Sequence, residues 1–275
     1  MSNVPIILPV VERTDLPKQK PIHPNLPEPP NLWVLISPIK TGKSTILSNL
    51  TLNDNFYGQD YWDIVKVISN TIHADNTSRF LLKAFDCEDH YEDSMIDDII
   101  ASQKKFEKVD QPSMCVILDD CLGSIRREAR FNHFCSRFRH FLGVGATVII
   151  SSQNFRMVSP IIRQNATAVI IGSPFPNQKE LLKVAEEYGD MFGGQENWLK
   201  LYKLATPNRY DFLFMNLNEN PATAFHNFEK QIGEGERIFT DESNIDISDI
   251  IDGKTNNLKK NIDDNINNGA NNGNE

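Results

Sequence analysis

Residues 32–45 read LWVLISPIKTGKST and carry the clearest indication of the fold. An apolar run typical of a buried strand passes through a loop into the start of a helix. A loop that ends in Gly-Lys-Ser in this setting matches the phosphate-binding pattern, in which backbone N–H groups surround a phosphate at a helix N-terminus. The predicted nucleotide-binding residues are Ser37, Pro38, Ile39, Lys40, Thr41, Gly42, Lys43, Ser44 and Thr45.

The residues of this loop have distinct expected roles toward Mg²⁺ and ATP. Gly42 permits close backbone approach, Lys43 places a positive charge on the β- and γ-phosphates, and the Ser44 hydroxyl binds Mg²⁺. Ser37 stands where the pattern usually has its first glycine, and its Cβ restricts the turn. Lys40 is either an extra phosphate contact or an exposed loop lysine, and the second interpretation is favoured.

A second apolar run ends in two carboxylates: residues 114–120 read MCVILDD. Asp119 is expected to hold Mg²⁺ at the carboxyl end of this strand, next to the phosphate loop. Asp120 is expected to act as the general base that polarises the attacking water. Motor ATPases usually have Glu at this second position, and Asp is shorter by one methylene group.

A third run, residues 146–153, reads ATVIISSQ and also ends in polar residues. Gln153 is expected to hydrogen-bond the γ-phosphate or the attacking water. A third polar strand end favours a motor ATPase over a small-molecule kinase.

Arginines gather in the helix expected over residues 125–141, which carries Arg126, Arg127, Arg130, Arg137, Arg139 and His140. Three interpretations remain open: a solvated face, contacts to DNA phosphates, or an arginine finger that reaches the ATP of a neighbouring subunit. Arg163, expected on a strand-end loop on the active-site side, is a second finger candidate. The sequence does not separate Arg139 from Arg163.

Short apolar runs alternate with helical patterns along the chain. Strands are expected over residues 32–37, 64–69, 114–119, 146–152, 168–172 and 210–217, and helices over residues 45–52, 95–108, 125–141, 178–188 and 196–204. This alternation predicts an α/β fold with a mostly parallel sheet and helices on both faces.

The ends of the chain differ from its centre. Residues 1–30 hold eight of the 15 prolines and are expected to form an extended arm that lies on the domain or on a neighbour. Residues 31–220 form the expected ATPase domain. Residues 221–275 are acidic and Asn-rich, and are expected to be largely disordered. The net charge is −9, but residues 229–275 carry eleven acids and five bases, so the preceding part is close to neutral.

Composition excludes several classes of protein. The N-terminus lacks the basic region of a signal peptide, and no apolar run is long enough for a membrane span. The four cysteines form no CxxC pair and are expected to be free thiols.

The order of these motifs resembles the FtsK–HerA superfamily, and within it the packaging ATPases of poxviruses, giant viruses and virophages. The matching segments are residues 34–45, 116–120, 137–153 and 160–165. The resemblance implies a RecA-like P-loop NTPase fold and a homo-oligomeric ring that moves double-stranded DNA into a capsid. It also implies a capsid partner and a place in the host cytoplasm, the virus factory or the virion.

Two other functions remain open on the sequence. One is a P-loop kinase of nucleotides or small molecules, although no clear Arg-rich lid is present. The other is an assembly protein that binds ATP with little turnover, a hypothesis raised by Ser37 and Asp120.

Overall fold

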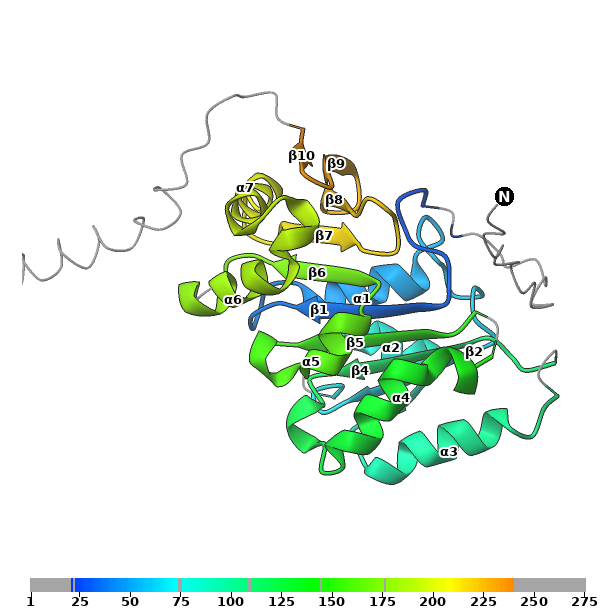
Figure 1. The fold of residues 1–275 in the computed structure, drawn as a ribbon. Helices are drawn as coiled ribbons and strands as arrows, with labels where there is room; N and C mark the ends of the chain where they lie inside the picture. The colour runs from blue at the N-terminus through cyan, green and yellow to red at the C-terminus, as the bar shows by residue number, and fades with distance from the viewer. Residues whose placement is uncertain are drawn as a thin grey trace, which may run out of the picture.

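A mixed sheet flanked by helices organises the chain (Figure 1). The structure is a computed structural model, and it describes residue 21 and residues 23–239, apart from residues 74, 75, 108, 109, 144 and 176. Within these residues ten strands follow the order β10-β9-β8-β7-β6-β1-β5-β4-β2-β3. Strands β1 to β6 are parallel to one another, and β7 to β10 extend the sheet as antiparallel strands beyond β6.

The parallel strands are β1 (Asn31–Ile36), β2 (Ile64–Ser69), β3 (Asp86–Glu88), β4 (Met114–Asp119), β5 (Thr147–Ser152) and β6 (Ala168–Gly172). The antiparallel strands are β7 (Phe212–Asn216), β8 (Thr223–His226), β9 (Lys230–Glu234) and β10 (Arg237–Ile238). The helices are α1 (Lys43–Leu52), α2 (Arg79–Ala84), α3 (Asp93–Gln103), α4 (Glu128–Phe141), α5 (Pro160–Asn165), α6 (Gln178–Tyr188) and α7 (Gln195–Ala205). Short 3-10 turns are η1 (Leu122–Ser124), η2 (Phe155–Met157) and η3 (Gly189–Phe192).

Strand β1 shows why the sheet is covered on both faces. All six of its residues are buried, as expected for a continuous apolar run in a parallel sheet. Because side chains alternate along a strand, Leu32 and Val34 enter the core beneath α3–α7, whereas Trp33 and Leu35 enter the core beneath α1 and α2. Figure 1 shows α1 and α2 behind the sheet and α3–α6 in front of it. The predicted fold class is confirmed.

Register brings the polar strand ends together. Asp119 of β4 pairs with Ser69 of β2 on one side and with Ser151 of β5 on the other. Ser151 in turn pairs with Leu35 of β1, two residues before the loop that begins at Ser37. Because these strands are parallel, the phosphate loop, the two acids and Gln153 lie along one edge of the sheet.

The folded region extends beyond the boundary expected at residue 220. The sequence predicts a largely disordered tail from residue 221, but β8, β9 and β10 lie between residues 223 and 238 and continue the sheet, so this boundary is wrong. The remainder of the expected tail, residues 240–275, lies outside the described residues.

The expected N-terminal arm is described only at residue 21 and residues 23–30. These residues lie on their own domain: Leu26 is 4% exposed in the core beneath α1, and the Asn25 amide donates a 2.6 Å hydrogen bond to the Phe228 carbonyl.

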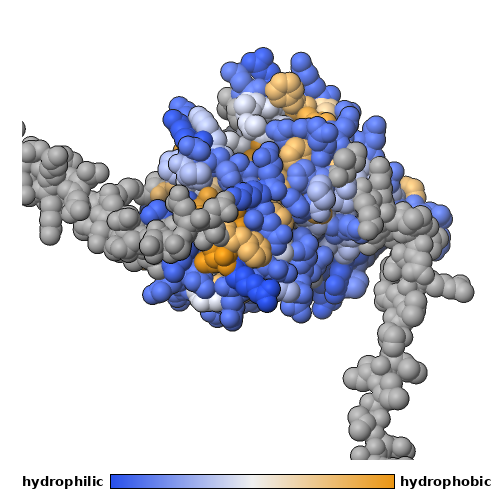
Figure 2. Space-filling view, turned by 90° about the horizontal axis from the view of Figure 1, so that it is seen from above, coloured by the Kyte–Doolittle hydropathy of each residue, from blue (hydrophilic) through white to orange (hydrophobic). Residues whose placement is uncertain are grey.

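The surface agrees with the composition. Figure 2, which views the molecule from above, shows a largely hydrophilic face with small hydrophobic patches. Among the described residues, no helix combines the length and apolar character that crossing a membrane requires.

Candidate nucleotide-binding site

The phosphate loop has the backbone that its sequence predicts. Gly42 is the N-terminal cap of α1 and has a φ of 95°, a left-handed conformation that strains residues with a Cβ. Its carbonyl accepts the first helical hydrogen bond from the Ile46 N–H at 2.9 Å. The N–H groups of the following residues therefore emerge at the helix N-terminus, where they favour an anion.

Ser37, the departure from the usual pattern, is accommodated by a glycine on the next strand. A Cβ added to Gly172 of β6 would lie 2.0 Å from the Ser37 Oγ and 2.7 Å from its Cβ. The Thr41 hydroxyl donates to the Pro38 carbonyl at 2.5 Å and is hydrogen-bonded to the Ser37 hydroxyl. Because the proton of Thr41 is used in the first bond, Ser37 donates in the second. Ser37 thus ties the two ends of the loop together.

Three of the predicted catalytic residues meet at one carboxylate. The Lys43 ammonium donates to the Ser37 carbonyl at 3.1 Å and lies 3.4 Å from the Asp120 Oδ2. The Gln153 amide donates to the same Asp120 oxygen at 2.8 Å. The side chains of Lys43 and Asp120 are 9% and 16% exposed, so this ion pair is only partly screened by solvent.

Asp120 is held in an unusual backbone conformation. Its φ is 52°, in the left-handed region that non-glycine residues seldom adopt. Its N–H donates to the Ser151 carbonyl at 3.1 Å, and its own carbonyl accepts from the Asn70 amide at 3.2 Å. The ends of β2 and β5 therefore hold Asp120 in a strained backbone conformation. Strain of this kind is common at functional sites.

Asp119 lies deeper than Asp120, with only 4% of its surface exposed. Its Oδ2 accepts a 2.9 Å hydrogen bond from Ser69, and its Oδ1 accepts a bond from Ser151. Burial raises the pKa of the Asp119 carboxyl above its ordinary value, because the charged form loses water, and the two hydroxyl donors oppose this shift. A nearby cation would therefore stabilise the charged form.

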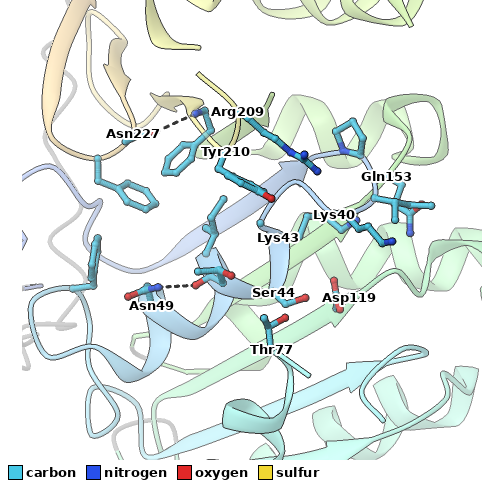
Figure 3. Close-up of a pocket in the computed structure, with 18 of the residues that line it drawn as sticks. Lys40, Lys43, Ser44, Asn49, Thr77, Asp119, Gln153, Arg209, Tyr210 and Asn227 are labelled. Carbon is cyan, nitrogen blue, oxygen red and sulfur yellow. Dashed lines mark hydrogen bonds between the residues drawn. The ribbon is translucent and has the colours of Figure 1, made fainter. Parts of the chain in front are cut away.

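The residues at this point fit a bound Mg²⁺. A carboxylate offers about four lone-pair positions, so the two serine hydroxyls leave room for further partners. Figure 3 shows the Ser44 hydroxyl, the Thr77 side chain and the Asp119 carboxylate grouped near one another beside the loop, and all three line one cavity. Oxygen donors of this kind suit Mg²⁺. Thr77 was not predicted from the sequence.

The cavity has a volume of about 1240 Å³ and extends beyond the phosphate loop. Its lining includes most of the predicted phosphate loop together with Asp119, Asp120 and Gln153; Ser37 and Thr41 lie beneath it, both buried. The rest of the lining includes residues that the sequence did not predict: His23, Phe56, Arg209, Tyr210, Asn227 and Phe228. No local motif marks them, because they come from four separate segments.

The two arginine-finger candidates lie outside this cavity. Arg139 is exposed in the last turn of α4, the turn that leads back to the start of β5 and so faces away from the phosphate-loop edge. Arg163 lies in helix α5, not on a loop as expected. Its guanidinium is 3.0 Å from the Glu187 carboxylate and 4.5 Å from the centre of the Phe155 ring, and its side chain is 16% exposed.

Solved structures of two viral packaging proteins have a similar fold. The crystal structure of B204, the DNA-packaging ATPase from Sulfolobus turreted icosahedral virus, superposes with a TM-score of 0.51 at 16% identity, covering 73% of this chain and 98% of that chain. The sulfate complex of the genome-packaging NTPase B204 from Sulfolobus turreted icosahedral virus 2 gives a TM-score of 0.50 at 15% identity, covering 72% and 96%. The chain has a RecA-like P-loop NTPase fold. No protein-family model matches the chain, and a sequence search of curated proteins finds no match.

Proposed function

We propose that the protein is an ATP-hydrolysing motor that moves double-stranded DNA into a viral capsid. The observation that carries the proposal is the convergence of Lys43 and Gln153 on Asp120, beside the buried Asp119. This arrangement joins a phosphate-binding cation, an amide and a general base at the N-terminus of one helix.

The contacts suggest how these residues divide the work. The Lys43 ammonium shares its charge between the Ser37 carbonyl and Asp120, and a triphosphate in the loop would compete for it. Asp120 would then be free to accept a proton from water, while Gln153, bonded to the same carboxylate, orients that water. Mg²⁺ held by Ser44 and Asp119 would neutralise charge on the phosphates.

Three observations favour a DNA motor over the alternatives. The order of the motifs resembles the FtsK–HerA superfamily, and the fold resembles that of a viral DNA-packaging ATPase. The amide of Gln153 donates to the proposed base, Asp120. Loss of the γ-phosphate would therefore change the contacts of Gln153 at the end of β5. We further propose a homo-oligomeric ring, a capsid partner, and a place in the host cytoplasm, the virus factory or the virion.

Arg139 is the better candidate for an arginine finger in such a ring. A finger must reach the nucleotide of a neighbouring subunit, and the Arg139 side chain is exposed. Arg163, in contrast, is engaged by Glu187 and Phe155 of its own chain.

Phosphate release measured with and without linear duplex DNA tests the proposal. A motor releases phosphate faster when DNA is added. Transfer of phosphate to a nucleoside would indicate a kinase, and tight ATP binding without turnover would indicate an assembly protein. Either result would overturn the proposal.

A further inference from the structure

The cavity continues well past the phosphate loop. It follows α1 from Ser44 to Asn49, and five residues of helix advance about 7.5 Å. Beyond Asn49 the wall contains the rings of His23, Phe56 and Phe228, and the polar side chains of Asn55, Asn227 and Glu229 lie among them. Among the described residues, the cavity thus has one end suited to phosphates and another end, the apolar end below, where aromatic rings supply much of the wall.

Three rings from distant parts of the chain close the apolar end. The His23 ring stacks on Phe56, with centroids 5.2 Å apart and planes 5° apart, and Phe228 meets Phe56 edge-on at 5.3 Å. The hydrogen bond from the Asn25 amide to the Phe228 carbonyl fastens the N-terminal segment to the β8–β9 turn. This aromatic cluster is therefore preorganised by tertiary contacts.

Tyr210 stands between the cluster and the phosphate loop. It is 56% exposed although it lines the cavity, and its φ of 77° places it in the left-handed region. Its ring lies 3.9 Å from the position that a Cβ on Gly42 would occupy, and the Arg209 guanidinium is 5.0 Å from its centroid. In Figure 3 the ring lies over the start of α1, between Arg209 and Lys43.

The turn that carries Tyr210 is fixed on both sides. The Asp211 carboxylate accepts from the Asn208 N–H at 2.9 Å, and the Asn227 side-chain carbonyl accepts from the Phe212 N–H at 3.0 Å. The amide nitrogen of Asn227 is 3.3 Å from Asp211. An exposed aromatic ring held in a strained conformation above a phosphate site is explained if a flat ligand packs on it.

We propose that this end of the cavity is a nucleobase subsite, in which Tyr210 stacks on the base and the aromatic cluster closes the far side. The inference rests on the proposed binding of ATP at the phosphate loop. The Asn227 side chain is committed to the turn, so stacking, and not a hydrogen bond from Asn227, supplies the base affinity. Stacking on an aromatic side chain is a general way to hold a base.

The test compares two ligands that share phosphates but differ in the base. Titration calorimetry measures the dissociation constants of ATP and of inorganic tripolyphosphate, each with Mg²⁺, for the wild type, Tyr210→Ala and Tyr210→Phe. Tyr210→Ala should weaken ATP about 5- to 150-fold, the range expected for one lost base–aromatic stack. It should leave tripolyphosphate binding unchanged, and Tyr210→Phe should retain ATP affinity.

The exposed Phe106, which is not part of the cavity lining, provides a matched control. Phe106→Ala should change neither constant. Equal losses for ATP and tripolyphosphate in Tyr210→Ala, or no loss for ATP, would overturn the subsite. If the wild type bound neither ligand, the proposed function itself would fail.

Discussion

Gly172→Ala tests whether the phosphate loop depends on a missing side chain in the neighbouring strand. The new Cβ would lie 2.0 Å from the Ser37 Oγ and 2.7 Å from the Ser37 Cβ. Rotation of the Ser37 hydroxyl cannot relieve the second contact, so the loop backbone must move. Overpacking of this kind costs about 1–3 kcal/mol. Because the Ser37 carbonyl also accepts from Lys43, we expect weaker ATP binding as well.

The double variant Ser37→Gly/Gly172→Ala provides the control. With Ser37 reduced to glycine, the nearest remaining atom of residue 37 is its Cα at 3.4 Å, an ordinary contact. Ser37→Gly alone loses the bond to Thr41, at a cost of about 1 kcal/mol. Urea unfolding and ATP binding of all four proteins complete the cycle. The double variant should be more stable than Gly172→Ala; strictly additive losses would show that Ser37 and the Cβ added at position 172 do not clash.

Further changes, to charged groups and to the C-terminal segment, have distinct expected results. Asp120→Asn should keep Mg·ATP binding and slow turnover about 10²–10⁴-fold. Asp119→Asn should weaken Mg²⁺-dependent nucleotide binding, as measured by nucleotide titration. Identical defects in the two variants would contradict separate roles for the two carboxylates. Arg139→Ala should lose turnover but keep ATP binding, and mixing with Lys43→Ala subunits should restore part of the phosphate release; a concentration-independent active monomer would contradict a finger in trans. Arg163→Ala should lower the free energy of unfolding by about 1–3 kcal/mol, since it removes the bond to Glu187; unchanged urea unfolding would contradict this. Deleting residues 256–275 should leave the melting temperature and basal phosphate release unchanged, because that composition buries little apolar surface; a large fall would contradict it.

The central strands were predictable because their apolar runs are continuous and end in polar groups. Residues 114–119 and 168–172 match β4 and β6 as observed. Strands β8 and β9 were not predictable in this way. They are short, they follow Pro221, and β9 reads KQIGE, so their pairing with the sheet decides their structure more than their own propensity does.

The phosphate end of the site was predictable and the apolar end was not. Lys43, Asp120 and Gln153 each follow a recognisable strand or loop, and parallel pairing brings them to one edge. The apolar end depends on contacts such as that between Asn25 and Phe228, which are 203 residues apart in the chain. Arg163 was misplaced for a different reason, because a local signal was overlooked: Ser159 caps a short helix by accepting from the Ile162 N–H, and Pro160 follows it at the helix start, so the expected loop is α5.

Whether the protein moves along DNA can be measured by triplex displacement. A short third strand bound to linear duplex DNA reports translocation when it is displaced, and the displacement is followed with Mg²⁺ and ATP for the wild type and for Lys43→Ala. The proposed motor should displace the third strand only when ATP is hydrolysed. Lys43→Ala should displace none, because it lacks the ammonium group that would contact the β- and γ-phosphates. ATP hydrolysis by the wild type without displacement, or displacement by Lys43→Ala at the wild-type rate, would show that the protein is not a motor driven by this ATP site.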